Sequence, residues 1–401
     1  MRIIEQADKL QKMHYEVRGP VVEEADKMLL RGENVLKLNI GNPAVFGFNA
    51  PDALFDEIAA HIRDAQPYSD SKGILSSREA IVEYCTSKGF PNVDSDSVFI
   101  GNGASDVICI AMQALLNTGD EILLPSPDYP LWTAAVNLSG GTPVHYICDE
   151  QADWNPDIES IKKSITPRTK AIVVINPNNP TGALYSLEVL KEIVEIARQN
   201  DLIIFADEIY DRVVMEGEHT SIASLAPDLF CVTFNGLSKS HIICGYRCGW
   251  MALSGDKSRA QGYIAGINML ASIRLCANVP AQYVIPVALK DKENPHCKPG
   301  GRLYEQGKYV YEALNRIPGV SAVKPKAAMY IFPKLDKKVF NITDDQKFAL
   351  DFLHQQRVLV VQGTGFNWIK PDHFRIVFLP EVAQLKNAME KLENFLSNYR
   401  Q

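Results

Sequence analysis

The sequence predicts an α/β protein with two parts: a large domain, whose mixed and mostly parallel sheet is covered by helices, and a smaller α+β domain. Between about residues 75 and 253, short apolar segments alternate with helical segments. Such alternation is typical of a mostly parallel sheet with helices on both faces. After residue 301, helical segments stand beside hairpin-like strands, and this second pattern predicts the smaller domain.

Length and composition are those of an ordinary globular protein. The chain has 401 residues, of which 46% are hydrophobic and 22% charged, enough for two domains. A net charge of −7 and a pI near 5.7 provide no basic field, so neither nucleic acid nor a membrane is an expected partner. No segment approaches the roughly 20 uncharged apolar residues of a membrane-spanning helix.

The cysteines and the N-terminal residues indicate a cytoplasmic protein. Eight cysteines lie mostly within apolar segments, without Cys-x-x-Cys pairs, which predicts reduced thiols and no metal site. Residues 1–9 mix acidic and basic side chains and lack the apolar core of a signal peptide, so no cleaved leader is expected.

The N-terminal segment, residues 1–45, is expected to pack with the smaller domain. Apolar residues at helical spacing predict a helix between residues 15 and 34. A strand over residues 35–40 follows and ends in the loop Gly41-Asn42-Pro43. Because this strand lies outside the alternating region, we expect it beside the C-terminal part of the chain.

The large domain is expected to span residues 46–290. Apolar segments rich in β-branched residues predict its strands, which cover residues 97–100, 121–124, 171–175, 202–206, 231–234 and 251–253. The intervening helical patterns cover residues 105–116, 186–199 and 256–275.

The smaller domain is expected to take up residues 291–401. A segment rich in Lys, Pro and Gly, residues 290–301, is typical of a domain boundary. Beyond it the sequence predicts a helix over 302–316, strands over 328–332 and 374–378, and a closing helix over 382–398.

A lysine and an arginine follow the strand 231–234. Asn-Gly ends that strand, and Lys239 comes just beyond it among mostly uncharged neighbours, where an amine can serve as a Schiff-base nucleophile. Eight residues later, Arg247 stands between two glycines and offers a fork of donors that suits phosphate. An amine and a phosphate fork together indicate pyridoxal phosphate. An isolated pair of this kind is more often two surface residues, so other parts of the chain must decide.

Ligands in open α/β sheets collect at the carboxyl ends of the strands, and three such ends carry suitable groups. After strand 97–100, Gly103-Ala104-Ser105 opens a helix; this is either a phosphate seat or a simple N-cap. Tyr129 follows strand 121–124 and either stacks on a flat ring or fills the core. Asn179, in the loop after strand 171–175, donates its amide to a ligand or only forms a turn.

An acidic residue follows the strand 202–206. The strand is apolar, Asp207 comes directly after it, and Tyr210 stands three residues further along the chain. A carboxylate at the end of a buried strand requires a cationic partner, and a protonated pyridine nitrogen is one. The alternative is that Asp207 caps a turn.

Together these residues resemble a known family. Asn-Pro-Asn-Asn-Pro-Thr-Gly at 176–182, Asp-Glu-Ile-Tyr at 207–210, Ser238-Lys239 and Gly-Tyr-Arg-Cys-Gly-Trp at 245–250 resemble the motifs of fold-type I pyridoxal-phosphate aminotransferases, the aspartate aminotransferase superfamily. The resemblance covers nearly the whole chain. Within that superfamily the sequence is most similar to the bacterial glutamate–pyruvate (alanine) aminotransferases, notably over residues 128–135, 234–239, 274–282 and 299–306.

The resemblance implies pyridoxal 5'-phosphate as cofactor and a role for each matching residue. Lys239 is then the catalytic lysine that binds the cofactor and moves the substrate α-proton. The other cofactor-binding residues implied are Gly103, Ala104, Ser105, Tyr129, Asn179, Asp207, Tyr210, Ser238, Arg247 and, from a partner subunit, Tyr68. The substrate-binding residues implied are Gly41, Tyr15, Tyr129, Asn179 and Arg375, the last as the clamp for the α-carboxylate. The Tyr68 match implies a homodimer with shared active sites.

Three positions depart from the family pattern, one of them Ala327, where the family has Gly. Many relatives have a hydroxyl three residues before the lysine, where this chain has Gly236; Ser238 and Asn235 are the residues expected to compensate. Aspartate-type enzymes read a second carboxylate with an arginine five positions before the Asn of an Asn-Pro segment. Here Ile273 stands at that offset and Arg274 one position later, so Arg274 is not assigned this role.

The expected activity is transamination between an L-amino acid and a 2-oxo acid, with L-alanine and 2-oxoglutarate as the leading pair. The enzymatic alternatives are a broader-specificity, aspartate or aromatic aminotransferase and a C–S β-lyase, which shares the fold and the lysine but releases ammonia. A non-catalytic effector-binding module is disfavoured because Lys239, Asp207, Arg247 and Arg375 are all present. A dinucleotide-binding dehydrogenase is disfavoured because no Gly-x-Gly-x-x-Gly follows a strand.

Overall fold

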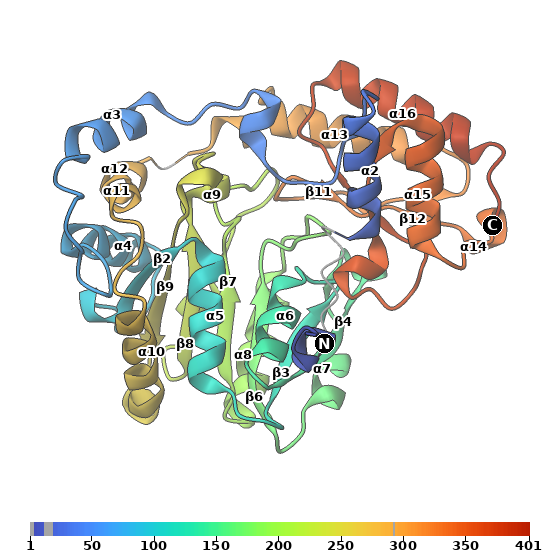
Figure 1. Ribbon diagram of the computed structural model, residues 1–401. Helices are drawn as coiled ribbons and strands as arrows, with labels where there is room; N and C mark the ends of the chain where they lie inside the picture. Colours follow the sequence, from blue (N-terminus) through green and yellow to red (C-terminus); the bar gives the residue numbers. More distant parts are fainter. Residues whose placement is uncertain (1–3, 12–18, 292) are drawn as a thin grey trace.

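An eight-stranded sheet forms the centre of the molecule (Figure 1), as seen in a computed structural model that describes residues 4–11, 19–291 and 293–401. In spatial order its strands are β2 (Val98–Asn102), β9 (Cys248–Gly255), β8 (Phe230–Gly236), β7 (Ile203–Asp207), β6 (Thr169–Ile175), β3 (Glu121–Ser126), β4 (Thr142–Asp149) and β5 (Asn155–Pro156). Only β9 and β5 run antiparallel to their neighbours. The prediction of a mixed, mostly parallel sheet is confirmed.

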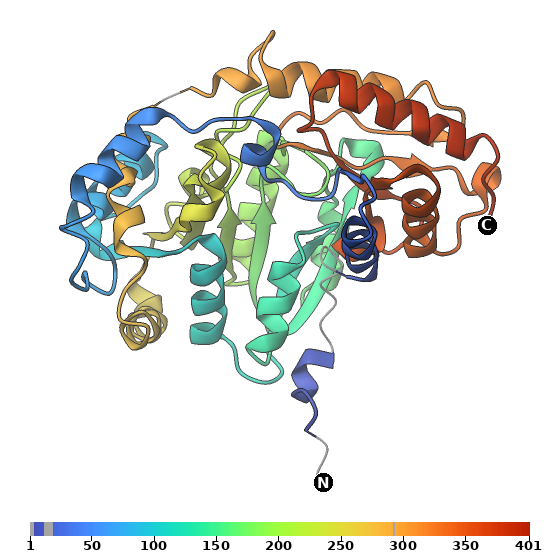
Figure 2. The same ribbon diagram turned by 45° about the horizontal axis from the view of Figure 1, so that its top comes forward.

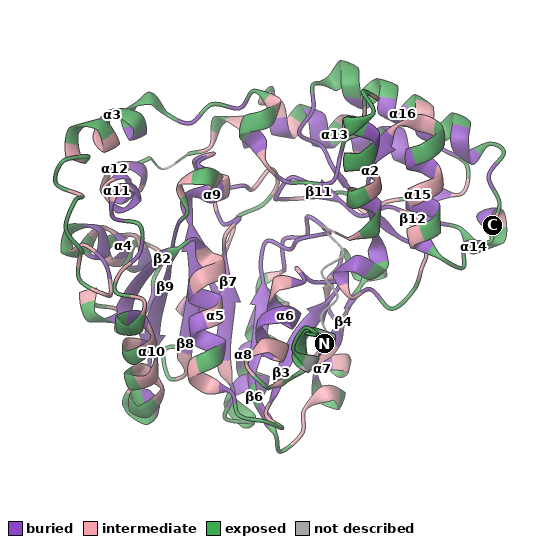
Figure 3. Ribbon diagram, viewed as in Figure 1, coloured by how far each residue is buried: buried purple, intermediate pink, exposed green. Residues whose placement is uncertain are grey.

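Helices cover both faces of this sheet because successive side chains of each strand point to opposite faces. In β2, Phe99 packs in a cluster with α5 (Ala104–Leu115), α6 (Leu131–Leu138) and α10 (Gln261–Ile273). Its neighbour Ile100 packs in the cluster on the other face, where the helices are α4 (Leu75–Ser87), α7 (Ile158–Ser164), α8 (Leu187–Gln199) and α12 (Val284–Ala288). The strands β2, β3 and β6 to β9 are accordingly buried almost throughout (Figure 3), whereas β4 at the margin of the sheet is only partly buried.

Short strands and three longer helices make up the C-terminal part. β11 (Tyr330–Ile331), β15 (Phe374–Val377) and β14 (Val361–Gln362) form an antiparallel sheet, and β10 (Val320–Ser321) pairs with β12 (Lys334–Leu335). Figure 1 shows α13 (Arg302–Leu314), α15 (Asp345–Gln356) and α16 (Val382–Leu396) gathered at one side of the large sheet, together with α2 (Pro20–Leu30). This arrangement agrees with the predicted α+β part.

The N-terminal segment contributes to that same part. α2 begins with Pro20 at its first position, where the missing N–H costs nothing, and β1 (Leu36–Lys37) pairs in parallel with β13 (Val358–Leu359). Figure 2 shows the chain between α2 and α3 (Asp52–His61) crossing the molecule toward the far side of the sheet. Residues 12–18, which include Tyr15, lie outside the described part of the chain.

The hydrophobic core is divided between the two parts. One cluster of buried side chains draws on residues 21–48 and 297–399, with only two members, Tyr210 and Val213, from the segments between. The two clusters on the faces of the large sheet draw almost entirely on residues 50–288. The remaining short helices are α1 (Asp8–Gln11), α9 (Leu237–Ser240), α11 (Val279–Gln282) and α14 (Lys337–Phe340). In the described residues, none of the helices has the length and apolar character needed to span a bilayer.

Candidate active site

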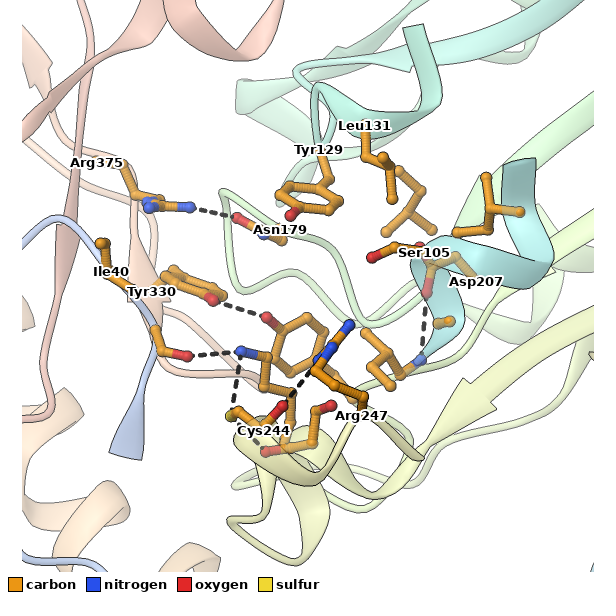
Figure 4. A pocket seen from close by; sticks show the side chains of 18 residues that line it. Ile40, Ser105, Tyr129, Leu131, Asn179, Asp207, Cys244, Arg247, Tyr330 and Arg375 are labelled. Atoms are coloured by element: carbon orange, nitrogen blue, oxygen red, sulfur yellow. Dashed lines mark hydrogen bonds between the residues drawn. The ribbon is translucent and has the colours of Figure 1, made fainter. Parts of the chain in front are cut away.

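A cavity of about 500 Å³ opens at the carboxyl edge of the large sheet, against the C-terminal part. Side chains from both parts face it, and several are labelled in Figure 4. Its lining combines most of the residues predicted from the sequence with others that were not: Ile40, Gly41, Ala104, Ser105, Ile108, Tyr129, Leu131, Ile175, Asn179, Asp207, Ile209, Tyr210, Ser238, Lys239, Cys244, Arg247, Tyr330 and Arg375.

Strand order explains how the chain assembles this site. β8, β7, β6 and β3 are consecutive neighbours and run parallel, so their carboxyl ends meet at one edge. Lys239 follows β8, Asp207 ends β7, Asn179 follows β6 and Tyr129 follows β3. Residues separated by more than a hundred positions in the sequence therefore become neighbours.

Asp207 is a buried acid at the base of the cavity. The Trp132 indole donates to its Oδ2 at 2.9 Å, and the backbone N–H of Ile209 donates to Oδ1 at 3.3 Å. Burial raises the pKa of Asp207 above its usual range, and the Trp132 hydrogen bond opposes that rise. A cation placed against this carboxylate would offset its desolvation.

Lys239 reaches across to the N-terminal segment. It lies on the short helix α9, and its Nζ donates to the backbone oxygen of Gly41 at 2.6 Å. The Sγ of Cys244 is 3.8 Å from the same nitrogen. The N-terminal loop that carries Gly41 thus forms one wall of the cavity beside the lysine.

The helix α5 and Arg247 form one end of the cavity. Ala104 and Ser105 begin the helix, where backbone N–H groups and the positive end of the dipole favour an anion. Arg247 donates to the backbone oxygen of Cys244 at 2.8 Å, and Gly103 makes room for its guanidinium, because a Cβ there would lie 2.2 Å from Nη2. Gly103 itself does not line the cavity.

Gly236 is required by the close approach of β9. An added Cβ would lie 2.6 Å from the backbone oxygen of Cys248 and 2.9 Å from the Cα of Gly249. No hydroxyl-bearing side chain fits there without moving backbone. Of the two residues expected to compensate, Ser238 lines the cavity. Asn235 does not: it donates to Asp211 at 2.9 Å and accepts from the N–H of Gly236, so its expected role is wrong.

Arg375 projects into the cavity from β15 on the opposite side. Its Nη1 donates to Oδ1 of Asn179 at 2.9 Å, as Figure 4 shows, and Nη2 donates to the backbone oxygen of Asn39. The guanidinium lies between the rings of Tyr330 and Phe366, 4.6 and 4.4 Å from the ring centroids. Because Asn179 accepts with its oxygen, its amide nitrogen is left to donate into the cavity.

Besides Gly103 and Asn235, three residues singled out from the sequence are not placed in this cavity. Tyr68 lies on the surface, 76% exposed. Tyr15 falls outside the described residues. Arg274 pairs with Asp106 and with the backbone oxygen of Ile100, so it is engaged at the start of α5 rather than facing a substrate.

The structure also adds residues that sequence reasoning missed. Tyr330, Cys244, Ile40 and Leu131 line the cavity, and Trp132 supports Asp207 from behind. Ile40 and Cys244 stand beside the Gly41 loop and the Lys239 segment, so proximity in sequence was the available signal. No signal in the sequence pointed to Tyr330, because it comes from a strand of the C-terminal part of the chain.

Comparison with known proteins identifies the family. A family model described as aminotransferase class I and II matches residues 33–392. The chain is a class I and II aminotransferase. Over the full length of both chains it is 57% identical to the glutamate–pyruvate aminotransferase AlaA of Escherichia coli. It is 53% identical to the alanine aminotransferase of Mycobacterium tuberculosis, covering 100% of this chain and 94% of that protein.

Solved aminotransferase structures agree with this assignment. A crystal structure of an aminotransferase from Escherichia coli superposes with a TM-score of 0.98, at 57% identity and with both chains fully covered. An alanine aminotransferase from Pyrococcus furiosus superposes with a TM-score of 0.92 at 39% identity, covering 98% of this chain and 100% of that one.

Aminotransferases of this class depend on pyridoxal 5'-phosphate, and the residues of this cavity fit that group. A buried acid suits a protonated ring nitrogen, and the forked donor beside a helix N-terminus suits a phosphate. In the part of the chain that is described, no cluster of three or more His, Cys, Asp or Glu side chains could hold a metal ion.

Proposed function

We propose that this aminotransferase exchanges amino groups between L-alanine and 2-oxoglutarate, giving pyruvate and L-glutamate. The observation that carries the proposal is the joint placement of Lys239, Asp207 and Arg375 around one cavity. The names of the full-length relatives, glutamate–pyruvate and alanine aminotransferase, supply the substrate pair.

We assign the cofactor contacts as follows. Asp207 pairs with the ring nitrogen, Tyr210 and Asn179 hold the phenolic oxygen, and Tyr129 stacks on the ring. The phosphate is held by the N-terminus of α5 and the loop after β8, through Gly103, Ala104, Ser105, Ser238 and Arg247.

When bound, pyridoxal phosphate supplies an aldehyde that links to amines and a ring that accepts electrons. Lys239 is the residue that takes the α-proton from the donor amino acid and, in the second half of the reaction, gives a proton to the α-carbon of the acceptor, because its Nζ lies in the cavity beside Gly41. Arg375 binds the α-carboxylate with its two-pronged guanidinium and so orients the substrate. Gly41 contributes its backbone to the same carboxylate.

Two arginines and one lysine line the cavity against one aspartate. Of these cations, Arg247 and Lys239 are assigned to the cofactor, so Arg375 is the one that attracts the carboxylate of amino acids and 2-oxo acids. The donor amino acid gives up its amine and leaves as a 2-oxo acid; a second 2-oxo acid then enters the same cavity and takes the amine. The reaction is therefore of the ping-pong type, with Lys239 moving the proton in both directions.

Side-chain selection depends on the wall opposite Arg375. In the described cavity the only other arginine is Arg247, at the phosphate end, so a charged reader for aspartate is not among these residues. We assign discrimination to Tyr129, to Tyr15 and to residues of a partner subunit. The methyl side chain of alanine needs no charged partner, and the same residues must still admit the longer side chain of glutamate.

A half-reaction screen tests the substrate assignment. The cofactor-loaded enzyme is mixed with single amino acids, without any 2-oxo acid, and loss of the visible absorbance band is followed. L-Alanine and L-glutamate should react fastest, and L-aspartate and aromatic amino acids at least about tenfold more slowly. Fastest reaction with aspartate or an aromatic amino acid would transfer the assignment to the corresponding alternative.

A C–S β-lyase shares this fold and lysine, so product balance must be measured as well. A transaminase forms one 2-oxo acid per amine accepted and releases no ammonia. Steady release of ammonia and pyruvate from a cysteine conjugate, with no acceptor added, would identify a lyase instead.

We further propose a homodimer in the cytoplasm. The exposed Tyr68 supports the dimer, since a tyrosine at 76% exposure can reach the phosphate end of a partner's cavity, as the resemblance implies. All eight cysteines are free thiols, which suits a reducing compartment.

We also propose a division into a large domain of residues 46–290 and a small domain of residues 291–401, with residues 1–45 packed on the small domain. The separation of the hydrophobic clusters supports this division.

A further inference from the structure

Tyr330 is a buried side chain of the cavity that the proposed function leaves without a role. It lines the cavity from β11 and is only 2% exposed. Its hydroxyl is 2.7 Å from the hydroxyl of Tyr210, and the two rings meet edge to face with centroids 5.7 Å apart. Figure 4 shows Tyr330 on the side of the cavity that also holds Arg375 and Ile40.

The sheet itself fixes Tyr330 against Arg375. Tyr330 pairs with Val377 across β11 and β15, so Arg375, two residues earlier on β15, is its diagonal neighbour on the same face. The guanidinium carbon lies 4.6 Å from the centroid of the Tyr330 ring, within the range of a cation–π interaction. The ring therefore forms one of two aromatic walls that hold the arginine.

The Tyr330 hydroxyl also lies close to the backbone of Gly41 in the N-terminal loop. A Cβ added to Gly41 would lie 2.1 Å from this oxygen, so the glycine is required for the contact. The backbone oxygen of Gly41 in turn accepts from Lys239. Tyr330 thus touches the clamp for the carboxylate, the loop beside the lysine and the tyrosine assigned to the phenolic oxygen.

The direction of the hydrogen bond between the Tyr210 and Tyr330 hydroxyls determines the role of Tyr330. A phenol has one proton to donate. If Tyr210 donates its proton to the phenolic oxygen of the cofactor, its own oxygen is left to accept, and Tyr330 is the neighbour that can donate to it. Burial, together with Tyr330, raises the pKa of Tyr210 well above its ordinary value, so Tyr210 remains a neutral donor.

We propose that Tyr330 is a positioning residue with two separable contacts: its hydroxyl orients and polarises Tyr210 toward the cofactor, and its ring holds Arg375 toward the substrate carboxylate. The inference rests on the proposed function, because it needs Tyr210 and Arg375 in their assigned roles. Chained hydrogen bonds strengthen one another, so the effect of the Tyr330 hydroxyl is transmitted through Tyr210.

The first test is a spectroscopic pH titration of the bound cofactor. A donor at the phenolic oxygen stabilises its anion and lowers the pH at which the lysine–cofactor link loses its proton. Tyr330→Phe removes the hydroxyl and keeps the ring, so the titration midpoint should rise by about 0.5 to 1 pH unit. Tyr311→Phe is the control: it removes the hydroxyl of a half-buried tyrosine on α13 and should leave the titration midpoint unchanged.

The double variant decides whether Tyr330 acts through Tyr210. Tyr210→Phe alone should raise the midpoint further than Tyr330→Phe. Adding Tyr330→Phe to Tyr210→Phe should then produce no further shift of the midpoint, because the Tyr210 hydroxyl through which Tyr330 acts is already missing. An unchanged midpoint in Tyr330→Phe, or the same shift with and without Tyr210, would overturn the inference.

The second test concerns the ring. Binding of 2-oxoglutarate to the pyridoxal form is measured by calorimetry for Tyr330→Phe and Tyr330→Leu. The Phe variant should bind within about twofold of wild type, and the Leu variant roughly five- to tenfold more weakly, since it loses the cation–π contact. Equal affinity of the two variants would remove the ring from the proposal.

These outcomes are distinguishable from a failure of the proposed function. If the wild-type protein shows no cofactor titration and binds no 2-oxo acid, the assigned roles fail as a whole. If the wild type shows both and the Tyr330 variants match it, only the role of Tyr330 fails.

Discussion

Several independent contacts fix the orientation of the Arg375 guanidinium. Only 2% exposed, it donates to Asn179 and to the backbone of Asn39 and lies between two aromatic rings. A guanidinium is planar and can donate to a carboxylate with two parallel N–H groups, which an ammonium cannot. The fixed orientation therefore suits the proposed recognition of a planar carboxylate.

Arg375→Lys should accordingly weaken carboxylate binding while leaving cofactor binding unchanged. We expect the KM for the amino acid to rise about ten- to a hundredfold, with an unchanged cofactor spectrum. Steady-state kinetics and the absorbance band measure the two quantities. An unchanged KM would contradict the assignment of Arg375 as the clamp.

At the residue scale, the site could be predicted where a side chain follows directly from a strand. Asp207, Asn179 and Lys239 were predicted because each comes at or just after the end of a buried apolar segment, and the cavity brings them together. Trp132 and Tyr330 were not, because an aromatic residue in a helix or a short strand gives no local sign of which acid or tyrosine it will meet.

At the scale of elements, the pair β8 and β9 carries the lysine segment. The two strands run antiparallel up to Gly236 opposite Gly249, and this pairing of glycines allows the backbones to approach closely. The absence of a side chain at Gly236 thus has a steric cause, which the sequence pattern of relatives did not reveal.

Gly236→Ala should therefore destabilise the protein. Its Cβ would meet the backbone oxygen of Cys248 at 2.6 Å, and the required shift of backbone should cost about 1–3 kcal/mol in the free energy of unfolding. Gly262→Ala, in α10, is the matched control, because its Cβ meets nothing within 4 Å. This variant should have a free energy of unfolding up to about 1 kcal/mol higher than that of the wild type. Urea unfolding compares the two, and a Gly236 variant as stable as wild type would exclude the steric explanation.

The end of β7 buries a second acid next to Asp207. Glu208 is 2% exposed and accepts from the Ser221 hydroxyl at 2.7 Å. Burial raises the pKa of Glu208 to about 8 from an ordinary value of 4.5, against the lowering effect of Lys88. Between these values the folded protein binds a proton that the unfolded chain has released, so stability must fall as the pH rises.

Glu208→Gln should remove that pH dependence. The contribution of Glu208 is fully present below its unfolded pKa and is lost as the pH rises through its folded pKa. From about pH 5 to about pH 8 the wild type should therefore lose up to roughly 1.4 kcal/mol per pH unit relative to the variant. Urea unfolding at several pH values provides the comparison, and parallel stability curves would show that Glu208 does not titrate in this range.

Elements were predicted where their burial is regular and missed where it is not. β6 and β7 each contain an uninterrupted apolar run, residues 171–175 and 203–206, and were found within a few residues of their observed bounds. β4 was missed because most of its residues are only partly buried, so it presents no apolar run. In α4 the buried face includes Ser77 and Arg78, which hides the helical periodicity.

At the scale of the molecule, the active site draws on both the large sheet and the C-terminal part. Lys239, Asp207 and Arg247 come from the side of the large sheet, whereas Tyr330 and Arg375 come from the C-terminal part. The sequence predicted the two parts from a change of pattern. The strand expected at residues 35–40 beside the C-terminal part pairs there as β1 with β13, but the sequence did not single out β13 as its partner, because pairing between distant segments leaves no local signal.

Shared active sites in the proposed dimer can be tested by complementation. Tyr68→Ala should weaken cofactor binding in the partner's site and, because Tyr68 is largely exposed, hardly change the stability of its own fold. Mixing this variant with Lys239→Ala, which lacks the catalytic amine, should restore about a quarter of the sites once subunits exchange. Each mixed dimer then has one complete site. If the mixture recovers no activity although size measurements show exchange, the sites are not shared.

The central claim is that Lys239 binds pyridoxal phosphate at the carboxyl edge of the sheet. Its most direct test is the absorption spectrum of the protein loaded with cofactor, compared between wild type, Lys239→Ala and Lys239→Arg, with turnover of L-alanine and 2-oxoglutarate measured on the same samples. The wild type should show a pH-dependent visible band and activity, and both variants should lack the band and all but a trace of turnover, since neither side chain can form the link. A variant that keeps both the band and the activity would contradict the account.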